Sequence, residues 1–187
     1  MRSKVVLALI GFVTAMLGMD SAMAGKRTLQ LDPYAARTMN GAGRNLGTLG
    51  DAGINVPQGG EFGFGMTIPK PYKANSLLRV ILQWHIADPN CSVELLPDFL
   101  DRTRPGHAPT TGPATGGFVP EDSSIVLTAG NVPGQGYVKV YTISPAQGFD
   151  QISGDALLFS FIRGSGANDT CGSDLMISAV TIEYLTP

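Results

Sequence analysis

Glycine and proline recur throughout this chain, and their distribution limits the secondary structure that it can form. The 187 residues include 24 glycines and 13 prolines. After residue 24, no window of about a dozen residues carries an apolar stripe at helical spacing. Both residues destabilise a helix interior relative to alanine, glycine by about 1 kcal/mol and proline by about 3 kcal/mol. The sequence therefore predicts an all-β fold of short strands and turns.

Several segments place apolar side chains at every second residue. Phe62, Phe64 and Met66 share one face in this way, and Trp84 belongs to a similar face further along the chain. A period of two residues is typical of a strand with one buried side. We expect strands at residues 28–31, 61–68, 78–86, 124–128, 137–143, 156–163 and 175–184.

Turn-rich segments separate these strands. The longest, residues 101–122, contains eight glycines and prolines and is expected to be an exposed loop. Residues 25–60 are also rich in glycine and are expected to form a separate N-terminal segment. Short strands with turns between them predict an antiparallel β-sandwich, jelly-roll-like, over residues 61–187.

The first 24 residues predict a cleavable secretory signal. Arg2 and Lys4 precede an apolar run that ends near Leu17, and the segment closes with Ala22-Met23-Ala24, which predicts cleavage before Gly25. The run is shorter than the roughly 20 apolar residues of a membrane-spanning helix. We therefore expect a secreted or periplasmic protein, or one at the cell surface, with no transmembrane segment after cleavage.

The charge of the mature chain argues against nucleic acid as a partner. Cleavage would leave 11 basic and 14 acidic residues, a net charge near −3. Binding to phosphate backbones depends on clustered lysine and arginine. We expect no nucleic-acid partner.

Two cysteines, Cys91 and Cys171, remain after the predicted cleavage. In an oxidising compartment an even pair predicts a disulfide. In the chain-entropy model, closing a loop of this length stabilises the fold by about 4 kcal/mol. Neither cysteine has a histidine or second cysteine nearby at metal-ligand spacing, which disfavours a zinc site or a catalytic thiol.

The predicted disulfide would bring two groups of acidic and amide side chains together. Calcium binds several carboxylate, amide and carbonyl oxygens, so these side chains are candidate ligands. The same residue types are common in turns, where they bond the local backbone, and the chain has no EF-hand loop pattern. We expect no cofactor, with calcium as the alternative. The candidate ligands are Asp88, Asn90, Asn168, Asp169 and Asp174.

A polar row on the 78–86 strand is the candidate ligand-binding face. Arg79, Gln83 and His85 alternate with the apolar residues that we expect in the core. Such a row on a sheet face can contact a glycan. The alternative is an ordinary solvated face, which antiparallel sheets commonly have.

The chain lacks the motifs that would indicate an enzyme. It has no G-x-S-x-G elbow, no H-E-x-x-H and no phosphate-binding glycine loop. His85 and His107 are the first candidates for a general base. A structural role for each histidine is favoured, and we expect no catalytic residue.

The C-terminal part of the chain resembles a known architecture. Its elements are the segments Gly154-Asp155-Ala156-Leu157-Leu158-Phe159, Arg163-Gly164, Asn168-Asp169-Thr170, Ser173-Asp174 and Val180-Thr181-Ile182-Glu183-Tyr184. This pattern resembles the C-terminal strand pair of jelly-roll β-sandwich domains in phage tail or fibre proteins and in uncharacterised bacterial proteins. The resemblance implies a fold far more than a function.

Together these features predict an exported, non-enzymatic β-sandwich that acts by contact. It would serve as a surface accessory, adhesive or assembly subunit, with a protein or a glycan at the cell surface as partner, and homo-oligomers remain open. The alternative is a carbohydrate-binding module, and the third choice is a hydrolase.

Overall fold

The computed structural model describes residues 25–45, 53–106, 110–113, 125–143 and 152–187. Within these ranges the chain forms 12 strands and one short 3₁₀ helix, η1 (Pro33–Ala35). The described residues include no helix long and apolar enough to span a membrane. The expected secretory signal lies outside the described residues, as do residues 107–109 and 114–122 of the expected loop.

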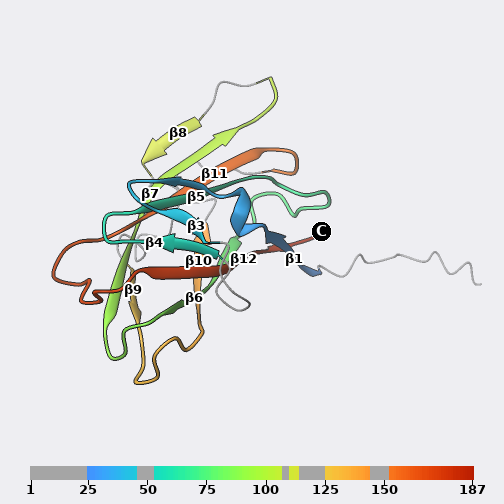
Figure 1. Cartoon of the computed structure of the whole chain (residues 1–187). Helices are drawn as coiled ribbons and strands as arrows, with labels where there is room; N and C mark the ends of the chain where they lie inside the picture. Colours follow the sequence, from blue (N-terminus) through green and yellow to red (C-terminus); the bar gives the residue numbers. More distant parts are fainter. Residues whose placement is uncertain (1–24, 46–52, 107–109, 114–124, 144–151) are drawn as a thin grey trace, which may run out of the picture.

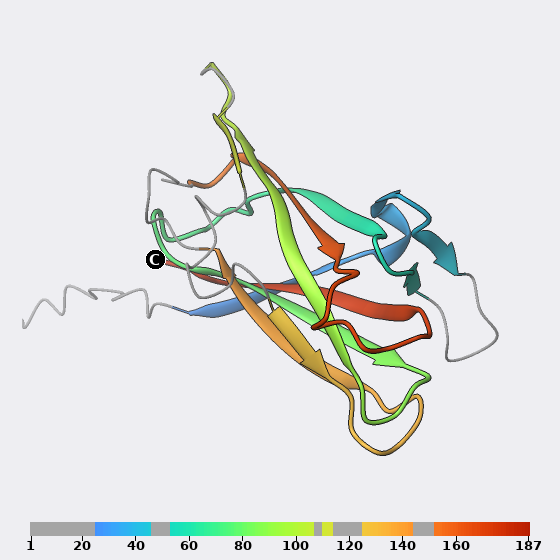
Figure 2. The ribbon, with the colours of Figure 1, turned by 90° about the vertical axis from the view of Figure 1, so that its left-hand side faces the viewer.

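The strands form two antiparallel sheets that face each other (Figures 1 and 2). Sheet A has the order β10-β6-β12-β4-β3, with β1 also paired to β12. Its strands are β1 (Lys26–Leu31), β3 (Gly43–Asn45), β4 (Gly53–Val56), β6 (Leu78–Ile86), β10 (Tyr137–Ile143) and β12 (Leu175–Leu185).

Sheet B has the order β2-β5-β11-β7-β8, with β9 also paired to β7. Its strands are β2 (Arg37–Met39), β5 (Glu61–Thr67), β7 (Ser92–Thr103), β8 (Thr110–Pro113), β9 (Ile125–Thr128) and β11 (Ala156–Arg163). From β4 to β7, and again from β9 to β12, consecutive strands alternate between the sheets, which gives a jelly-roll-like connectivity. The predicted antiparallel β-sandwich is confirmed. The link to phage proteins stays a prediction.

The core lies between the sheets and is built from the alternation seen in the sequence. Along β6, buried residues alternate with partly or fully exposed ones, and Trp84 is buried as expected. Burying an aliphatic or aromatic side chain of this size contributes about 1.5–3 kcal/mol. Core residues include Leu78, Val80, Leu82, Ile177, Val180 and Ile182 from sheet A and Phe62, Phe64, Leu95, Phe159 and Phe161 from sheet B.

Strand β7 was not expected from the sequence, although it is the longest strand in sheet B. Its proline, Pro97, lies opposite Phe161, next to the point where the β11–β7 register shifts. A bulge is one of the few places where a sheet tolerates proline. Because β7 continues to Thr103 and β8 follows, the expectation that residues 101–122 form one loop is wrong for 101–103 and 110–113.

Residues 25–60 contribute strands to both sheets. β1, β3 and β4 belong to sheet A, and β2 belongs to sheet B. Gly53 permits the close approach of β4 to β12, because a Cβ atom there would lie 2.2 Å from the Ile177 carbonyl oxygen. The glycines of this segment therefore include one that the sandwich itself requires.

Candidate functional site

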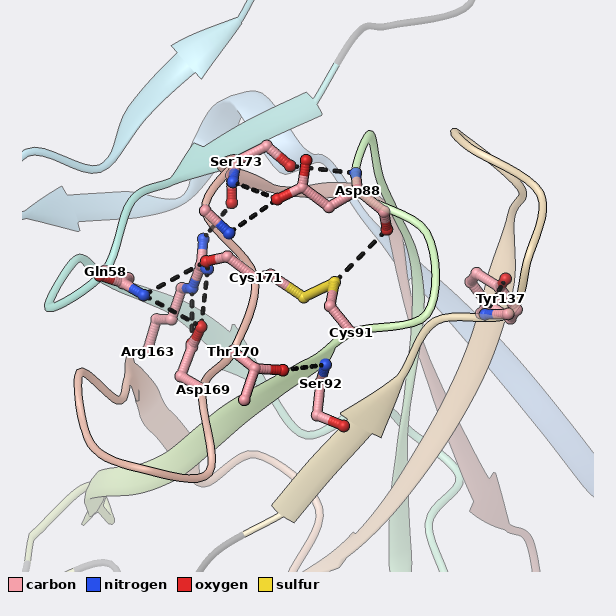
Figure 3. Close-up of a disulfide and its surroundings, with 12 residues drawn as sticks. Gln58, Asp88, Cys91, Ser92, Tyr137, Arg163, Asp169, Thr170, Cys171 and Ser173 are labelled. Atoms are coloured by element: carbon pink, nitrogen blue, oxygen red, sulfur yellow. Dashed lines mark hydrogen bonds and ion pairs between the residues drawn. A yellow bond between two sulfur atoms is a disulfide. The ribbon is translucent and has the colours of Figure 1, made fainter.

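Strand β11 lies between β5 and β7 in sheet B, and an arginine–carboxylate pair lies at each of its ends. The end near Arg163 is covered by the loop 164–174, which leads from β11 to β12 (Figure 3). The other end, near Ala156, borders a hollow.

The predicted disulfide between Cys91 and Cys171 is present and is confirmed. It joins residues 80 apart in the sequence, with their Cα atoms 5.2 Å apart. Both cysteines are buried. The bridge fixes the loop 164–174 to the start of β7 (Figure 3).

Arg163 organises this loop from inside the sandwich. Its side chain and that of Asp169 are both 0% exposed, and Nε and Nη2 of Arg163 donate to the two carboxylate oxygens over 2.8 and 2.9 Å. Three further hydrogen bonds of 2.8–3.0 Å go to the carbonyl oxygens of Val56, Cys171 and Ser173. All five N–H donors of the guanidinium are therefore used.

Asp88 holds the same loop from the other side. Its carboxylate accepts hydrogen bonds from the backbone N–H groups of Gly172 and Ser173, each over 2.7 Å. These bonds, chiefly the one from Ser173, hold the pKa of Asp88 below its ordinary value. We call the Arg163 end of β11, beneath the loop 164–174, the closed end. Its polar groups form hydrogen bonds to one another.

The five candidate calcium ligands lie near this network, but their observed contacts are with the protein. Asp169 binds Arg163, Asp174 accepts from Asn55 over 2.5 Å, and Asn168 donates to Glu94 over 3.1 Å. Asn90 is an exposed turn residue with a positive φ of 53°. Among the described residues, no three His, Cys, Asp or Glu side chains come together as metal ligands. Calcium binding here stays a prediction.

The candidate binding row lies on the outer face of sheet A, as expected. Arg79 is paired with Glu183 over 2.6 Å, and Lys26 binds the other carboxylate oxygen over 2.8 Å. The hydrogen bond from Lys26, followed by that from Arg79, lowers the pKa of Glu183. Gln83 is exposed and His85 is half-buried. Ligand binding by Arg79, Gln83 and His85 stays a prediction.

His85 and His107 were the candidate general bases, and Trp84 was expected in the core. His107 lies outside the described residues. Trp84 points into the core and stacks on Tyr137 with ring centroids 4.7 Å apart, so it cannot serve as a surface platform.

The hollow at the other end of β11 was not found from the sequence. It has a volume of about 460 Å³ and is lined by Gly65, Met66, Thr67, Thr103, Ala156, Leu157 and Leu158. Ala156 lies opposite Thr67 on one neighbouring strand and opposite Thr103 on the other. The two threonines are therefore two strand spacings apart, about 10 Å.

Gly65 creates much of this space. A Cβ atom at Gly65 would meet only a methyl carbon of Leu158, at 4.0 Å. Gly63, two residues earlier, differs because a Cβ atom there would lie 2.8 Å from the Phe159 carbonyl oxygen. Gly63 allows the strands to approach, whereas Gly65 leaves the outer face hollow.

An ion pair fixes the strand ends around the hollow. Arg104, just after β7, donates through Nε and Nη2 to the two carboxylate oxygens of Asp155, just before β11, over 2.8 and 2.9 Å. The backbone carbonyl of Asp155 accepts from Ile68, just after β5, over 2.8 Å. All three strands that line the hollow are therefore tied together beyond its edge.

The chemistry of the hollow favours an uncharged ligand. The lining residues are all uncharged, with two threonine hydroxyls beside apolar Leu158 and Ala156. Such a lining can donate and accept hydrogen bonds and contact an apolar surface, and no acid or base is among its described side chains. The signal in the sequence was the pair of glycines on the outward face of Glu61–Thr67.

No protein-family model matches the chain, and no curated protein matches it in sequence. Among solved structures, it is similar to the C-terminal carbohydrate-binding module CBM6 of a laminarinase from Zobellia galactanivorans (11% identity, 83% of this chain, 98% of that chain, TM-score 0.44). It is also similar to the xylan-binding module CBM15 (13% identity, 86% and 97%, TM-score 0.44). A third is the module CBM6cm-2 of Cellvibrio mixtus lichenase 5A, solved with cellotriose (12% identity, 83% and 95%, TM-score 0.42).

Proposed function

We propose that this chain is an exported, non-enzymatic domain that binds a neutral carbohydrate in the hollow on sheet B. The observation that carries the proposal is the uncharged lining, in which the Thr67 and Thr103 hydroxyls flank an apolar floor. A sugar ring carries hydroxyl groups around its rim and C–H groups on its faces. It therefore matches both parts of this surface.

The size and rigidity of the hollow support this proposal. Small-molecule sites generally have volumes of about 300–1,000 Å³, and the hollow has about 460 Å³. The Arg104–Asp155 pair holds the strand ends in place before any ligand arrives. Such preorganisation reduces the loss of conformational entropy on binding. The proposal rests on these features and not on the distant structural likenesses.

The disulfide supports the exported part of the proposal. Disulfides persist in oxidising compartments, and Cys91–Cys171 is buried and joined. We therefore place the domain outside the cytoplasm, where it would act by contact with a glycan at the cell surface or in the medium.

The test is to fill the hollow without disturbing the fold. Gly65→Leu places a side chain where only Leu158 comes within 4 Å, so it should fold and block the ligand. Gly43→Leu is the matched control, because a Cβ atom at Gly43 on sheet A meets none of the described atoms within 4 Å. Binding is measured by affinity electrophoresis in soluble xylan, mixed-linkage β-glucan, laminarin and polygalacturonate.

We expect retardation by at least one neutral polysaccharide, loss of it in Gly65→Leu and retention in Gly43→Leu. Retention in both variants would exclude the hollow. If Arg79→Ala or Gln83→Ala abolished binding instead, the ligand would lie on the outer face of sheet A. Binding to polygalacturonate alone would contradict a neutral ligand.

A further inference from the structure

Strand β10 forms one edge of sheet A and is regular over its whole length. It pairs with β6 over seven residues, Tyr137–Ile143, without a register shift. In the described part of the chain, no strand pairs with its other side. Figure 2 shows β10, in orange, along the rim of the molecule.

This edge has fewer of the features that usually prevent strands from pairing between molecules than the other outer strands of the described chain. Proteins protect such edges by keeping them short or by adding charges, prolines or bulges. Here β2 and β3 have three residues each, β8 and β9 have four each, and β1 begins with two basic residues. β10 has seven residues, no glycine or proline, and one charge, Lys139.

Apolar side chains lie beside the unpaired edge. Val138 is 63% exposed, the highest value among the exposed large hydrophobic residues described. Val140 follows it on the same outer face and lies opposite Ile81 of β6. Another strand paired to this edge would place side chains directly beside Val138 and Val140 on the outer face of sheet A.

We propose that β10 is the interface of a symmetric dimer, in which β10 of a second copy of this chain pairs antiparallel with it. A two-fold axis at Val140 lets all seven residues pair. Val138 then lies opposite Thr142 of the second copy, and Lys139 lies opposite Tyr141 of the second copy. This register keeps the two Lys139 side chains from facing each other, since like charges directly opposite are destabilising.

The two-fold arrangement closes on itself. Both copies use the same edge, so pairing stops at two chains and does not propagate into a filament. Sheet A would become continuous across the dimer, with the Val138, Val140 and Ile81 side chains of both copies adjoining on its outer face. This inference is independent of carbohydrate binding, because the hollow lies on sheet B.

A cysteine on the axis tests the register directly. Residues directly opposite each other in antiparallel strands have Cα atoms about 4.5–5.5 Å apart, which suits a disulfide. Val140→Cys should therefore crosslink to itself under mild oxidation and run as a covalent dimer on a non-reducing gel. Val126→Cys is the control, because Val126 is a valine on the outer face of the short strand β9 and is more exposed than the half-buried Val140.

Light scattering on the mature chain should give twice the monomer mass, and Val140→Lys should return it to the monomer mass with an unchanged circular dichroism spectrum. A monomer mass for the parent chain at all concentrations from about 1 to 100 μM would overturn the proposal. So would a dimer that persists in Val140→Lys, or a Val140→Cys chain that crosslinks no faster than Val126→Cys.

Discussion

Each end of β11 carries an arginine–carboxylate ion pair, and the two pairs differ in their exposure to solvent. Arg163 binds Asp169 at one end, and Asp155 binds Arg104 at the other, each through two N–H···O bonds. At the first end both side chains are 0% exposed, whereas 19% of the Arg104 side chain reaches solvent. The first pair closes the sandwich beneath a loop, and the second steadies strand ends beside an open hollow.

The difference shows that one sandwich can combine a fully buried ion pair with an open surface at the two ends of a single strand. A buried ion pair is tolerated only if further hydrogen bonds compensate for lost hydration, and Arg163 has all of its donors occupied. A substitution at the Arg163 end would therefore leave some of these buried groups without a hydrogen-bond partner. The other end leaves space over Ala156 and Thr67 that a ligand can occupy.

Removing the disulfide should have the largest effect on stability. The Cys91→Ala, Cys171→Ala double variant loses a crosslink between residues 80 apart, which the chain-entropy model values at about 4 kcal/mol. Guanidinium unfolding of the parent and the double variant measures the difference. Equal midpoints would mean that hydrogen bonds alone hold the closed end.

Neutralising Asp169 and Asp155 should destabilise the fold by different amounts, because the two carboxylates lie at different ends of β11. Asp169→Asn leaves the buried Arg163 charge without its counterion and should destabilise the fold by about 3 kcal/mol. Asp155→Asn leaves Arg104, which can reach water, and should cost about 1–2 kcal/mol. Thermal and chemical unfolding compare the two variants. Equal losses would contradict the distinction between a closed and an open end.

Removing the hydroxyls of the hollow should weaken binding and leave stability unchanged. Thr67→Val and Thr103→Val keep the side-chain shape but remove one hydrogen bond each, worth about 1 kcal/mol or roughly five-fold in affinity. Titration with the polysaccharide that retards the parent measures the change. Thr28→Val, an exposed threonine of β1 on sheet A, is the control and should bind as the parent does.

The smallest effect should be a dependence on pH at the closed end. The pKa of Asp88 is below its ordinary value of 3.8 because the Ser173 and Gly172 amides donate to the carboxylate. The unfolded chain therefore takes up this proton at higher pH than the folded chain. The stabilisation is present above about pH 4 and is lost as the pH falls through the lowered pKa.

Melting temperatures measured from about pH 5 to pH 2 test this effect. The parent should lose more stability over this range than Asp88→Asn, which lacks the titrating group. Curves of equal slope would show that the two amide bonds do not favour the charged carboxylate.

The core and the crosslink could be predicted from the sequence because both depend on local or pairwise signals. The alternation in Glu61–Thr67 and Leu78–Ile86 identified buried faces, including Trp84, before any partner strand was known. Cys91 and Cys171 were the only two cysteines, so their pairing had no alternative within the chain.

Features that depend on register could not be predicted in this way. β7 was missed because Pro97 interrupts its pattern, and only the bulge opposite β11 makes that proline acceptable. The hollow depends on Gly65 lying beside Leu158 and on Ala156 lying between two threonines. The Arg163–Asp169 pair likewise requires a buried arginine, which composition alone disfavours.

The pairing of β1 with β12 has a further consequence for how the molecule is connected. Gly25 donates to Thr186 Oγ1 over 3.1 Å, and the Thr186 N–H donates to the Gly25 carbonyl over 2.8 Å. The start of β1 therefore lies beside the end of β12. The two ends of the described chain are close enough together that its path nearly closes into a ring. A short peptide linking residue 187 to residue 25 would complete that ring, and a circularly permuted chain opened at another turn would keep every strand neighbour described above.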